Sequence, residues 1–142
     1  MDISNNLNNH WLAGFLDSDG SFQVKVLKRT NRTETRLYLQ VDQKTNPLLV
    51  LIKNEFGGYI GHRKSQDTYY YSSTSFGAAK KVINYLDKYN MLSSKYLNYL
   101  KWRKVYELVQ ERKHCTLEGQ AIILKIKLSM NSYSKETFDL NI

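Results

Sequence analysis

The sequence has very little cysteine or proline and no long apolar run, and each absence narrows the class of protein. Its single cysteine, Cys115, excludes an internal disulfide framework and a four-cysteine zinc site. No apolar run approaches the ~20 residues that span a bilayer, and residues 1–6 resemble neither a secretory signal nor an Arg-rich transit peptide. One proline and 42% apolar residues indicate a globular chain. We therefore expect one soluble domain, residues 1–142, in a reduced compartment and with no membrane partner.

The amino-acid usage indicates an AT-rich genome. Residues with AT-rich codons (Phe, Tyr, Met, Ile, Asn and Lys) number 54, those with GC-rich codons (Gly, Ala, Arg and Pro) number 18, and Lys outnumbers Arg by 15 to 6. Proteins made inside mitochondria or chloroplasts often have this composition and need no import signal. We expect an organellar location, with the cytoplasm of an AT-rich bacterium or a phage host as the alternative.

Positive charge is in excess and is unevenly placed. The chain carries 21 Lys and Arg against 13 Asp and Glu, a formal net charge of +8. Residues 23–36 alone have a net charge of +4, and residues 76–142 have +6. An excess of this size favours a polyanionic partner, although a solvated basic surface would have the same composition.

The pattern of apolar residues predicts an α+β domain. Strict alternation over residues 21–29 and 35–41 is typical of two half-buried strands, and residues 59–64 and 68–74 read as a second hairpin. Helices are expected at 11–17 after an Asn8 or Asn9 cap, between Asn46 and Gly57, at 76–89, from Ser93 or Ser94 to 112, and at 117–129 after a Thr116 cap. The fifth helix would bury a stripe of Ile122, Ile123, Ile126 and Met130. The two hairpins should form one four-stranded antiparallel sheet with the helices on a single face.

The face of this sheet turned away from the helices is polar and basic. Donors and acceptors that alternate along a twisted pair of strands can reach base edges in a DNA major groove. An ordinary solvated face is the alternative, but recurrent Gln, Arg and Tyr beside Lys favour DNA. The candidate DNA-binding residues are Gln23, Lys25, Arg29, Arg36, Tyr38, Gln40, Tyr59 and Arg63.

The segment at the end of the first helix has the composition of a functional site. Gly14 and Ser18 are four residues apart and share one helix face, which suits close approach of a second helix. Asp17 and Asp19 lie where the helix dipole disfavours anions, so a bound cation explains them better than helix stability does. A simple Asp-rich turn into the next strand is the alternative.

This segment, Leu-Ala-Gly-Phe-Leu-Asp-Ser-Asp-Gly at residues 12–20, resembles the motif of the LAGLIDADG homing endonucleases. Residues 41–45, 56–60 and 92–96 resemble weaker family segments, and the element order agrees over nearly the whole chain. The resemblance implies an αββαββα fold with extra C-terminal helices. It also implies a metal-dependent enzyme that hydrolyses phosphodiester bonds within long double-stranded DNA sites and spreads its host intron or intein.

The resemblance assigns roles by position. Asp19 matches the acid that binds the catalytic metal, usually Mg²⁺ with Mn²⁺ as a substitute, and the Ser18 carbonyl is a further ligand. Gln43 and Lys95 match the polar and basic residues around that metal, so Asp19, Gln43 and Lys95 form the expected catalytic set. Pro47 departs from the family, because some single-motif relatives place a pocket arginine close to this position. The residues expected at a helix–helix dimer interface are Ala13, Gly14 and Asp17.

A chain with one motif supplies one motif acid, whereas the family's site uses two. We therefore expect a homodimer that pairs through the first helix and acts on a near-palindromic site. One half of a longer two-motif protein is the alternative assembly. Two alternative functions use the same fold: an intron maturase that binds intron RNA, and a DNA-binding regulator that does not cleave.

Overall fold

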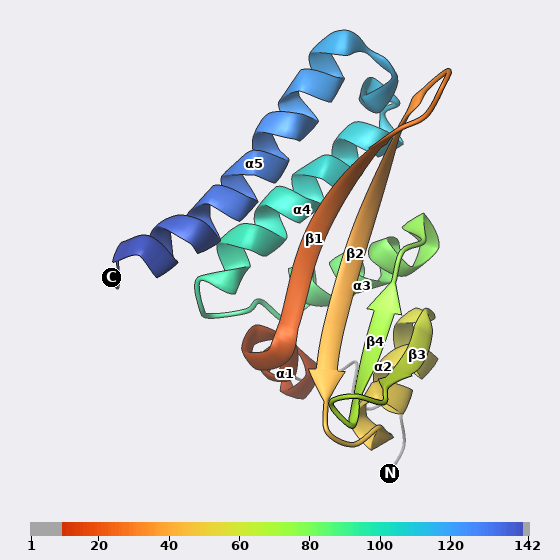
Figure 1. Cartoon of the computed structure of the whole chain (residues 1–142), viewed down its shortest axis with the longest axis vertical. Coiled ribbons are helices and arrows are strands. Elements are labelled where there is room, and N and C mark those ends of the chain that lie inside the picture. The colour runs from red at the N-terminus through yellow and green to blue at the C-terminus, as the bar shows by residue number, and fades with distance from the viewer. Residues whose placement is uncertain (1–9, 141–142) are drawn as a thin grey trace.

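The fold is a four-stranded antiparallel sheet covered on one face by helices (Figure 1). The computed structural model describes the backbone of residues 10–140 and the side chains of residues 10–130. The elements in chain order are α1 (Trp11–Asp19), β1 (Gly20–Lys28), β2 (Thr33–Gln43), α2 (Pro47–Phe56), β3 (Tyr59–Arg63), β4 (Thr68–Ser73), α3 (Phe76–Lys88), α4 (Lys95–Gln110), a short 3₁₀ turn (Lys113–Cys115) and α5 (Leu117–Leu140). The predicted α+β class and αββαββα order, with extra C-terminal helices, are confirmed.

The strands lie in the order β1-β2-β4-β3, with every neighbouring pair antiparallel. β1 and β2 form a long hairpin whose turn projects beyond the rest of the sheet (Figure 1). Gly20 pairs with Val41 at the base of this hairpin. That register places the end of α1 beside the end of β2, and it builds the site described below.

The core lies between the sheet and the helices, as the alternation predicts. Phe22 and Val24 of β1 are buried, and so are Leu37, Leu39 and Val41 of β2. From the helices, the fully buried side chains include Leu12, Leu16, Leu49, Ile52, Val82, Leu86 and Trp102. Burial of each such aliphatic side chain stabilises the fold by about 1.5–3 kcal/mol. The opposite face of the sheet is thereby left to solvent.

Helix ends follow local signals in the sequence. Pro47 occupies the first turn of α2, and Gly57 and Gly58 end that helix with φ of 79° and 100°, values that L side chains rarely adopt. The hydroxyl of Thr116 accepts a hydrogen bond from the Gly119 amide at 2.9 Å, so the predicted cap of α5 is confirmed.

Three details differ from the sequence-based expectations. The expected caps Asn8 and Asn9 lie outside the described residues, and α1 begins at Trp11 and continues to Asp19 rather than ending at Asp17. α5 continues to Leu140, well past residue 129. Ile122 was wrongly assigned to the buried stripe: it is 39% exposed, because α5 turns Ile123 and Met130 inward instead. Among the described residues, no helix has the length and hydropathy of a membrane span.

Candidate active site and DNA-binding face

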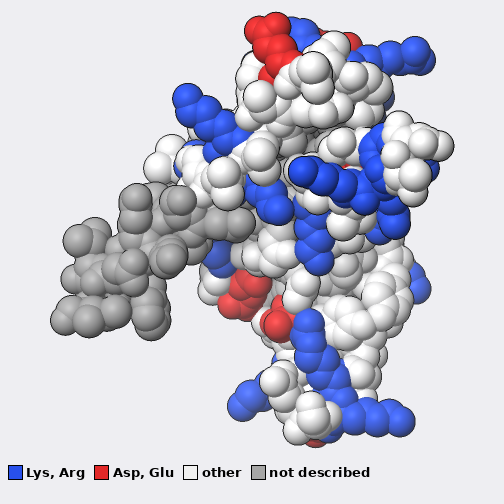
Figure 2. Space-filling model, turned by 45° about the horizontal axis from the view of Figure 1, so that its top comes forward, with Lys and Arg blue, Asp and Glu red and all other residues white. Residues whose placement is uncertain are grey.

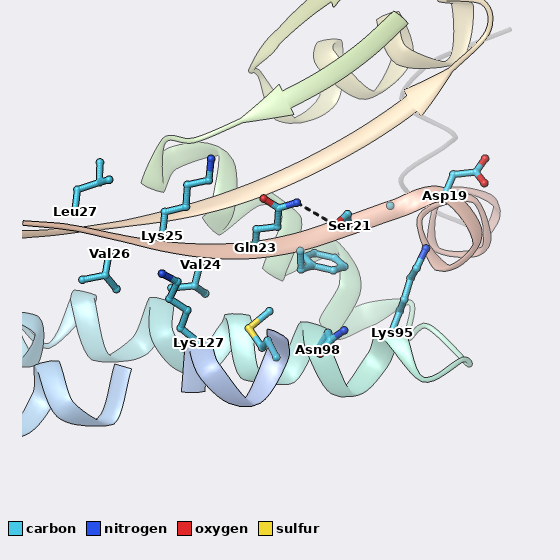
Figure 3. Close-up of a pocket in the computed structure, with 13 residues that line it drawn as sticks. Asp19, Ser21, Gln23, Val24, Lys25, Val26, Leu27, Lys95, Asn98 and Lys127 are labelled. Carbon is cyan, nitrogen blue, oxygen red and sulfur yellow. Dashed lines mark hydrogen bonds between the residues drawn. The ribbon is translucent and has the colours of Figure 1, made fainter. Parts of the chain in front are cut away.

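Four predicted site residues meet where α1, β2 and α4 converge. Asp19 is the last residue of α1, Gln43 the last of β2 and Lys95 the first of α4. The Gln43 amide donates to Asp19 Oδ2 at 2.7 Å, and Lys95 Nζ donates to the Ser18 carbonyl oxygen at 2.8 Å. Figure 3 shows Asp19 and Lys95 at the same end of the groove beside β1. Residues separated by up to 77 positions therefore form one polar cluster.

The turn that presents Asp19 requires glycine at the next position. A Cβ at Gly20 would lie 2.7 Å from the Leu16 carbonyl oxygen, which is too close for any other residue without movement of the backbone. The Gly20 amide donates to that same carbonyl and closes the helix. The exposed carboxylate of Asp19 is thus fixed at the start of β1.

The ammonium group of Lys95 is partly withdrawn from water. Burial lowers the pKa of Lys95 below its ordinary value, while the carboxylates of Asp19 and Asp17 act in the opposite direction. A desolvated cation interacts more strongly with nearby negative charge than a hydrated one does. Lys95 is therefore placed to stabilise an anion that forms beside Asp19.

Asp17 connects α1 to the chain that leads into α4. Its carboxylate accepts hydrogen bonds from the Leu92 amide at 3.1 Å, from the Ser93 amide at 3.0 Å and from the Ser93 hydroxyl. The Ser93 hydroxyl in turn accepts from the Lys95 amide at 3.2 Å. This clamp fixes the start of α4, and with it the position of Lys95, relative to α1.

The expected interface residues on α1 do not all lie on one surface. Gly14 and Ser18 are exposed, and no atom of the part of the chain that the structure describes lies within 4 Å of a Cβ built at Gly14. Ala13 was expected at the same interface, but its side chain is packed in this chain's own core and is 2% exposed. Its amide donates to the Tyr85 hydroxyl at 2.9 Å. The available face of α1 is therefore that of Gly14 and Ser18, because Ala13 and the Asp17 carboxylate are already used within the chain.

The donor set fits half of a divalent-cation site. No group of three or more His, Cys, Asp or Glu side chains suited to a metal occurs among the described residues. What one chain offers is the Asp19 carboxylate with the Ser18 carbonyl oxygen beside it, and both are the hard oxygen ligands that Mg²⁺ prefers. Two such half-sites would supply two carboxylates.

The outer face of the sheet carries seven of the eight predicted DNA-binding residues. Cross-strand pairing places Lys25 opposite Arg36 and Gln23 opposite Tyr38 on the face away from the helices. Because side chains alternate between the two faces of a strand, the pairing also places Gln40, Tyr59 and Arg63 on this outer face. Arg29 is the exception, since it lies one residue beyond the end of β1. Figure 2 shows Lys and Arg spread over much of the visible face, whereas Asp and Glu occupy a few small areas.

Two of the arginines share one carboxylate. Arg29 and Arg36 contact the same Glu34 oxygen, Oε2, at 3.0 Å and 3.4 Å. The hydrogen bond from Arg29 lowers the pKa of Glu34, with the charge of Arg36 acting in the same direction. The group keeps a net positive charge, and Glu34 limits the orientations of both guanidinium groups.

Sequence reasoning missed Tyr70 and Asp42, which hold Arg63 in place. The Arg63 guanidinium lies 4.3 Å from the centroid of the Tyr70 ring and donates to Asp42 Oδ1 at 2.9 Å. Gly61 allows this arrangement, because a Cβ there would lie 2.3 Å from the Tyr70 ring. Three consecutive tyrosines at 69–71 conceal the alternation, and only the pairing of Gly61 with Tyr70 shows which ring faces outward.

Residues 12–106 match the sequence model of the LAGLIDADG endonucleases. The chain belongs to this family. It is 62% identical over 125 residues to an uncharacterized cox1 intron-2 protein of 37.2 kDa from Schizosaccharomyces pombe, covering 88% of this chain and 39% of that protein. It is 30% identical to probable intron-encoded endonuclease 2 of Neurospora crassa, covering 88% of this chain and 29% of the relative.

Solved LAGLIDADG structures have the same architecture. The meganuclease I-SmaMI bound to uncleavable DNA superimposes with a TM-score of 0.79 at 30% identity, covering 85% of this chain and 44% of that one. I-TnaI, a homing endonuclease, has a TM-score of 0.81 over 98% of this chain and 97% of its own, at 22% identity, which supports the fold alone. The chain spans less than half the length of these two curated relatives and of I-SmaMI, and nearly all of I-TnaI.

Proposed function

We propose that the chain is a site-specific, metal-dependent endonuclease for double-stranded DNA. The observation that carries the proposal is the cluster of Asp19, Gln43 and Lys95 at one end of a basic, hydrogen-bonding sheet face. Family membership and the DNA-bound structure of I-SmaMI support it. An intact motif acid favours cleavage over a role as a regulator that only binds DNA.

Asp19 and the Ser18 carbonyl would hold a divalent cation, with Mg²⁺ as the expected ion and Mn²⁺ as a substitute. I-SmaMI bound to uncleaved DNA has been solved in the presence of calcium ions, which supports a divalent-cation requirement in the family. When bound, such a cation supplies activation of water and stabilisation of oxygen charge during phosphodiester hydrolysis.

The side chains around the cation would position the Asp19 carboxylate and stabilise negative charge on the phosphate. Gln43 donates to Asp19 Oδ2 and the Ser18 hydroxyl donates to Oδ1 at 3.2 Å, so each carboxylate oxygen keeps one further lone pair for a ligand. Lys95 supplies a fixed positive charge beside the reacting phosphate and is suited to stabilise the charge that develops there. Its present contact with the Ser18 carbonyl would exchange for phosphate oxygens in the complex with DNA.

DNA would lie across the outer sheet face. Gln23, Gln40 and Arg63 present donors and acceptors toward base edges, and Lys25 presents a charge for the backbone. Arg29 and Arg36, with Glu34 between them, lie near the hairpin turn that projects farthest from α1. The side chains of the β1–β2 hairpin would therefore contact the DNA target from the cleaved bond beside Asp19 outward.

We propose that two copies of this chain pair through the Gly14–Ser18 face of α1 and act on a near-palindromic site. No described atom lies within 4 Å of a Gly14 Cβ, which supports this pairing because the described part of the chain leaves the face open to a second helix. One observation favours a second assembly: the chain spans 39% of the Schizosaccharomyces pombe relative and 44% of I-SmaMI. In that assembly the second motif helix belongs to the remainder of a longer protein.

A mitochondrial location is proposed from the relatives, since one of them is named for a cox1 intron. The chloroplast and bacterial or phage alternatives remain predictions from composition. Binding of intron RNA also remains a prediction.

The test replaces the motif acid. Intron-free cox1 DNA in a plasmid is the first substrate, because a relative is named for a cox1 intron. We expect Mg²⁺-dependent linearisation by the wild-type chain, none by Asp19→Asn, and equal DNA binding by both. Asp67→Asn, an exposed aspartate in the β3–β4 turn, is the matched control and should cleave normally. Full cleavage by Asp19→Asn would overturn the catalytic assignment.

A further inference from the structure

A groove runs along the outer edge of β1, between that strand and the helices α4 and α5. Its volume is about 690 Å³. The polar side chains that line it include Asp19, Lys25, Lys95, Asn98 and Lys127. In Figure 3 the groove extends along β1 from Lys127 and Lys25 toward Lys95, with Asp19 at the far end. We call it the β1-edge groove.

Charge in this groove is strongly one-sided. Three of the residues that line it are lysines, Lys25, Lys95 and Lys127, whereas Asp19 is the one acidic residue in the lining. Lys127 is half-buried and forms no ion pair with a described side chain. A concave surface with walls of low dielectric constant focuses the field of such charges and attracts anions.

The backbone of β1 adds donors to the same groove. β1 is an edge strand, paired with β2 on one side alone. In an antiparallel pair, alternate residues point their N–H and C=O groups away from the partner, so half of the β1 amides face the groove. Ammonium groups and backbone amides together are the groups that contact phosphates in protein–DNA complexes.

Lys127 comes from a part of the chain that the family match does not cover. The match ends at residue 106, and α5 begins at Leu117. Figure 3 shows Lys127 on α5, with its side chain extended toward β1 from the helical side, while Lys25 extends from the strand on the other side. The two lysines therefore flank the exposed edge of β1.

We propose that the β1-edge groove binds a backbone phosphate of the DNA strand that passes Asp19, and that Lys127 is its main ligand. This inference rests on the proposed function, because it requires DNA on the sheet face with one strand passing Asp19 along this edge. It adds a phosphate site on a C-terminal helix to the contacts of the sheet. Such a contact would hold the DNA strand in a fixed position relative to Asp19 and Lys95.

The test measures how DNA binding depends on salt, and it needs no target site. Binding of a fluorescent duplex of mixed sequence is followed without divalent cations for the wild-type chain, Lys127→Ala and Lys127→Met. Each neutralised phosphate contributes about −0.9 to the slope of log K against log [salt]. We expect both variants to lose about one such unit and to bind several-fold more weakly. Lys125→Ala and Lys125→Met, on the same helix but outside the groove lining, should match the wild type.

The outcomes distinguish failure of the phosphate site at Lys127 from failure of the proposed DNA endonuclease function. Lys127→Met keeps most of the side chain, so equal melting temperatures for it and the wild type exclude a folding defect. If all variants bind DNA with the wild-type dependence on salt, the phosphate site is overturned. An equal loss for Lys125 and Lys127 variants would also overturn it, because that shows a diffuse effect of charge. No DNA binding by the wild-type chain would overturn the proposed function as well.

Discussion

Gln43 donates a hydrogen bond of 2.7 Å to Asp19, and this bond joins the end of β2 to the end of α1. The two residues are 24 positions apart and meet because Gly20 pairs with Val41 at the base of the β1–β2 hairpin. The Ser18 hydroxyl donates to the other Asp19 oxygen at 3.2 Å, so the two hydrogen bonds together fix the direction of the carboxylate. Gln43 is thus placed to orient the proposed metal-binding acid.

Replacing Gln43 with Ala is expected to slow DNA cleavage by about 10–100-fold, the usual cost of losing a partner that orients a metal ligand. The reduction should become smaller at high Mg²⁺ concentration, because weaker metal binding is one of its causes. Single-turnover cleavage over a Mg²⁺ titration measures both effects. Gln66→Ala, in the exposed β3–β4 turn, is the control, and a Gln43→Ala rate equal to that of the control would contradict the role.

The clamp of Asp17 on Leu92 and Ser93 predicts a defect in the placement of α4. In Asp17→Asn the amide nitrogen would face donors, and the charge-assisted hydrogen bonds would be lost. We expect the free energy of unfolding to fall by about 1–2 kcal/mol, in line with hydrogen bonds to a charged group. Chemical denaturation measures this change, and amide hydrogen exchange should accelerate at Leu92 and Ser93.

Exchange at the two amides separates a local role of Asp17 from a general loss of stability. In Asp17→Asn their protection should fall more than that of the core amides of β2. Asp87→Asn gives a matched control, since Asp87 accepts hydrogen bonds from Tyr99 and Arg103 elsewhere in the fold. Unchanged protection of Leu92 and Ser93 would show that the clamp does not hold the start of α4.

The architecture was predictable because its signals are local. Alternation along β1 and β2, Pro47 at the start of α2 and the Thr116 cap each depend on a few neighbouring residues, and all are confirmed. The candidate site was predicted mainly through the resemblance carried by residues 12–20 and by the weaker segments 41–45 and 92–96. Sequence spacing alone does not predict that Asp19 lies near Lys95, which is 76 positions later in the chain.

The rest depends on packing that a sequence does not display. Ala13 and Gly14 are adjacent small residues on one helix, yet the first is in the core and the second is exposed. Tyr70 is one of three consecutive tyrosines, and the register with β3 decides that it lies over Gly61. Lys127 looks like any helical lysine until the edge of β1 is placed beside it.

Gly61 predicts how the Arg63 side chain is held. In Gly61→Ala the new Cβ would meet the Tyr70 ring and push it aside, so that Arg63 loses its aromatic contact. The ring is at the exposed outer face, so the melting temperature should change little. Selection of bound DNA from a random library should show relaxed preference at one base pair per copy, at a cost of about 1–3 kcal/mol for the preferred base.

Arg63→Ala provides the reference for that experiment. It should relax preference at the same base pair as Gly61→Ala, since both remove one fixed guanidinium. Gly77→Ala, in the first turn of α3 with nothing near its Cβ, should leave the preference unchanged. If Gly61→Ala and Arg63→Ala affect different base pairs, Tyr70 does not position Arg63.

Because the Gly14 face of α1 is exposed, we expect Gly14→Leu to stabilise the single chain and to prevent pairing of two chains. Gly14→Leu should stabilise the helix by up to about 1 kcal/mol, because Gly is a poor helix former and no described atom lies within 4 Å of a Cβ at this position. The same side chain would hold two motif helices apart. Light scattering should therefore give a mass near twice 16.7 kDa for the wild type and near 16.7 kDa for the variant. A dimeric Gly14→Leu would place the interface elsewhere, whereas a monomeric wild type, even on DNA, would leave the second motif helix to the remainder of a longer protein.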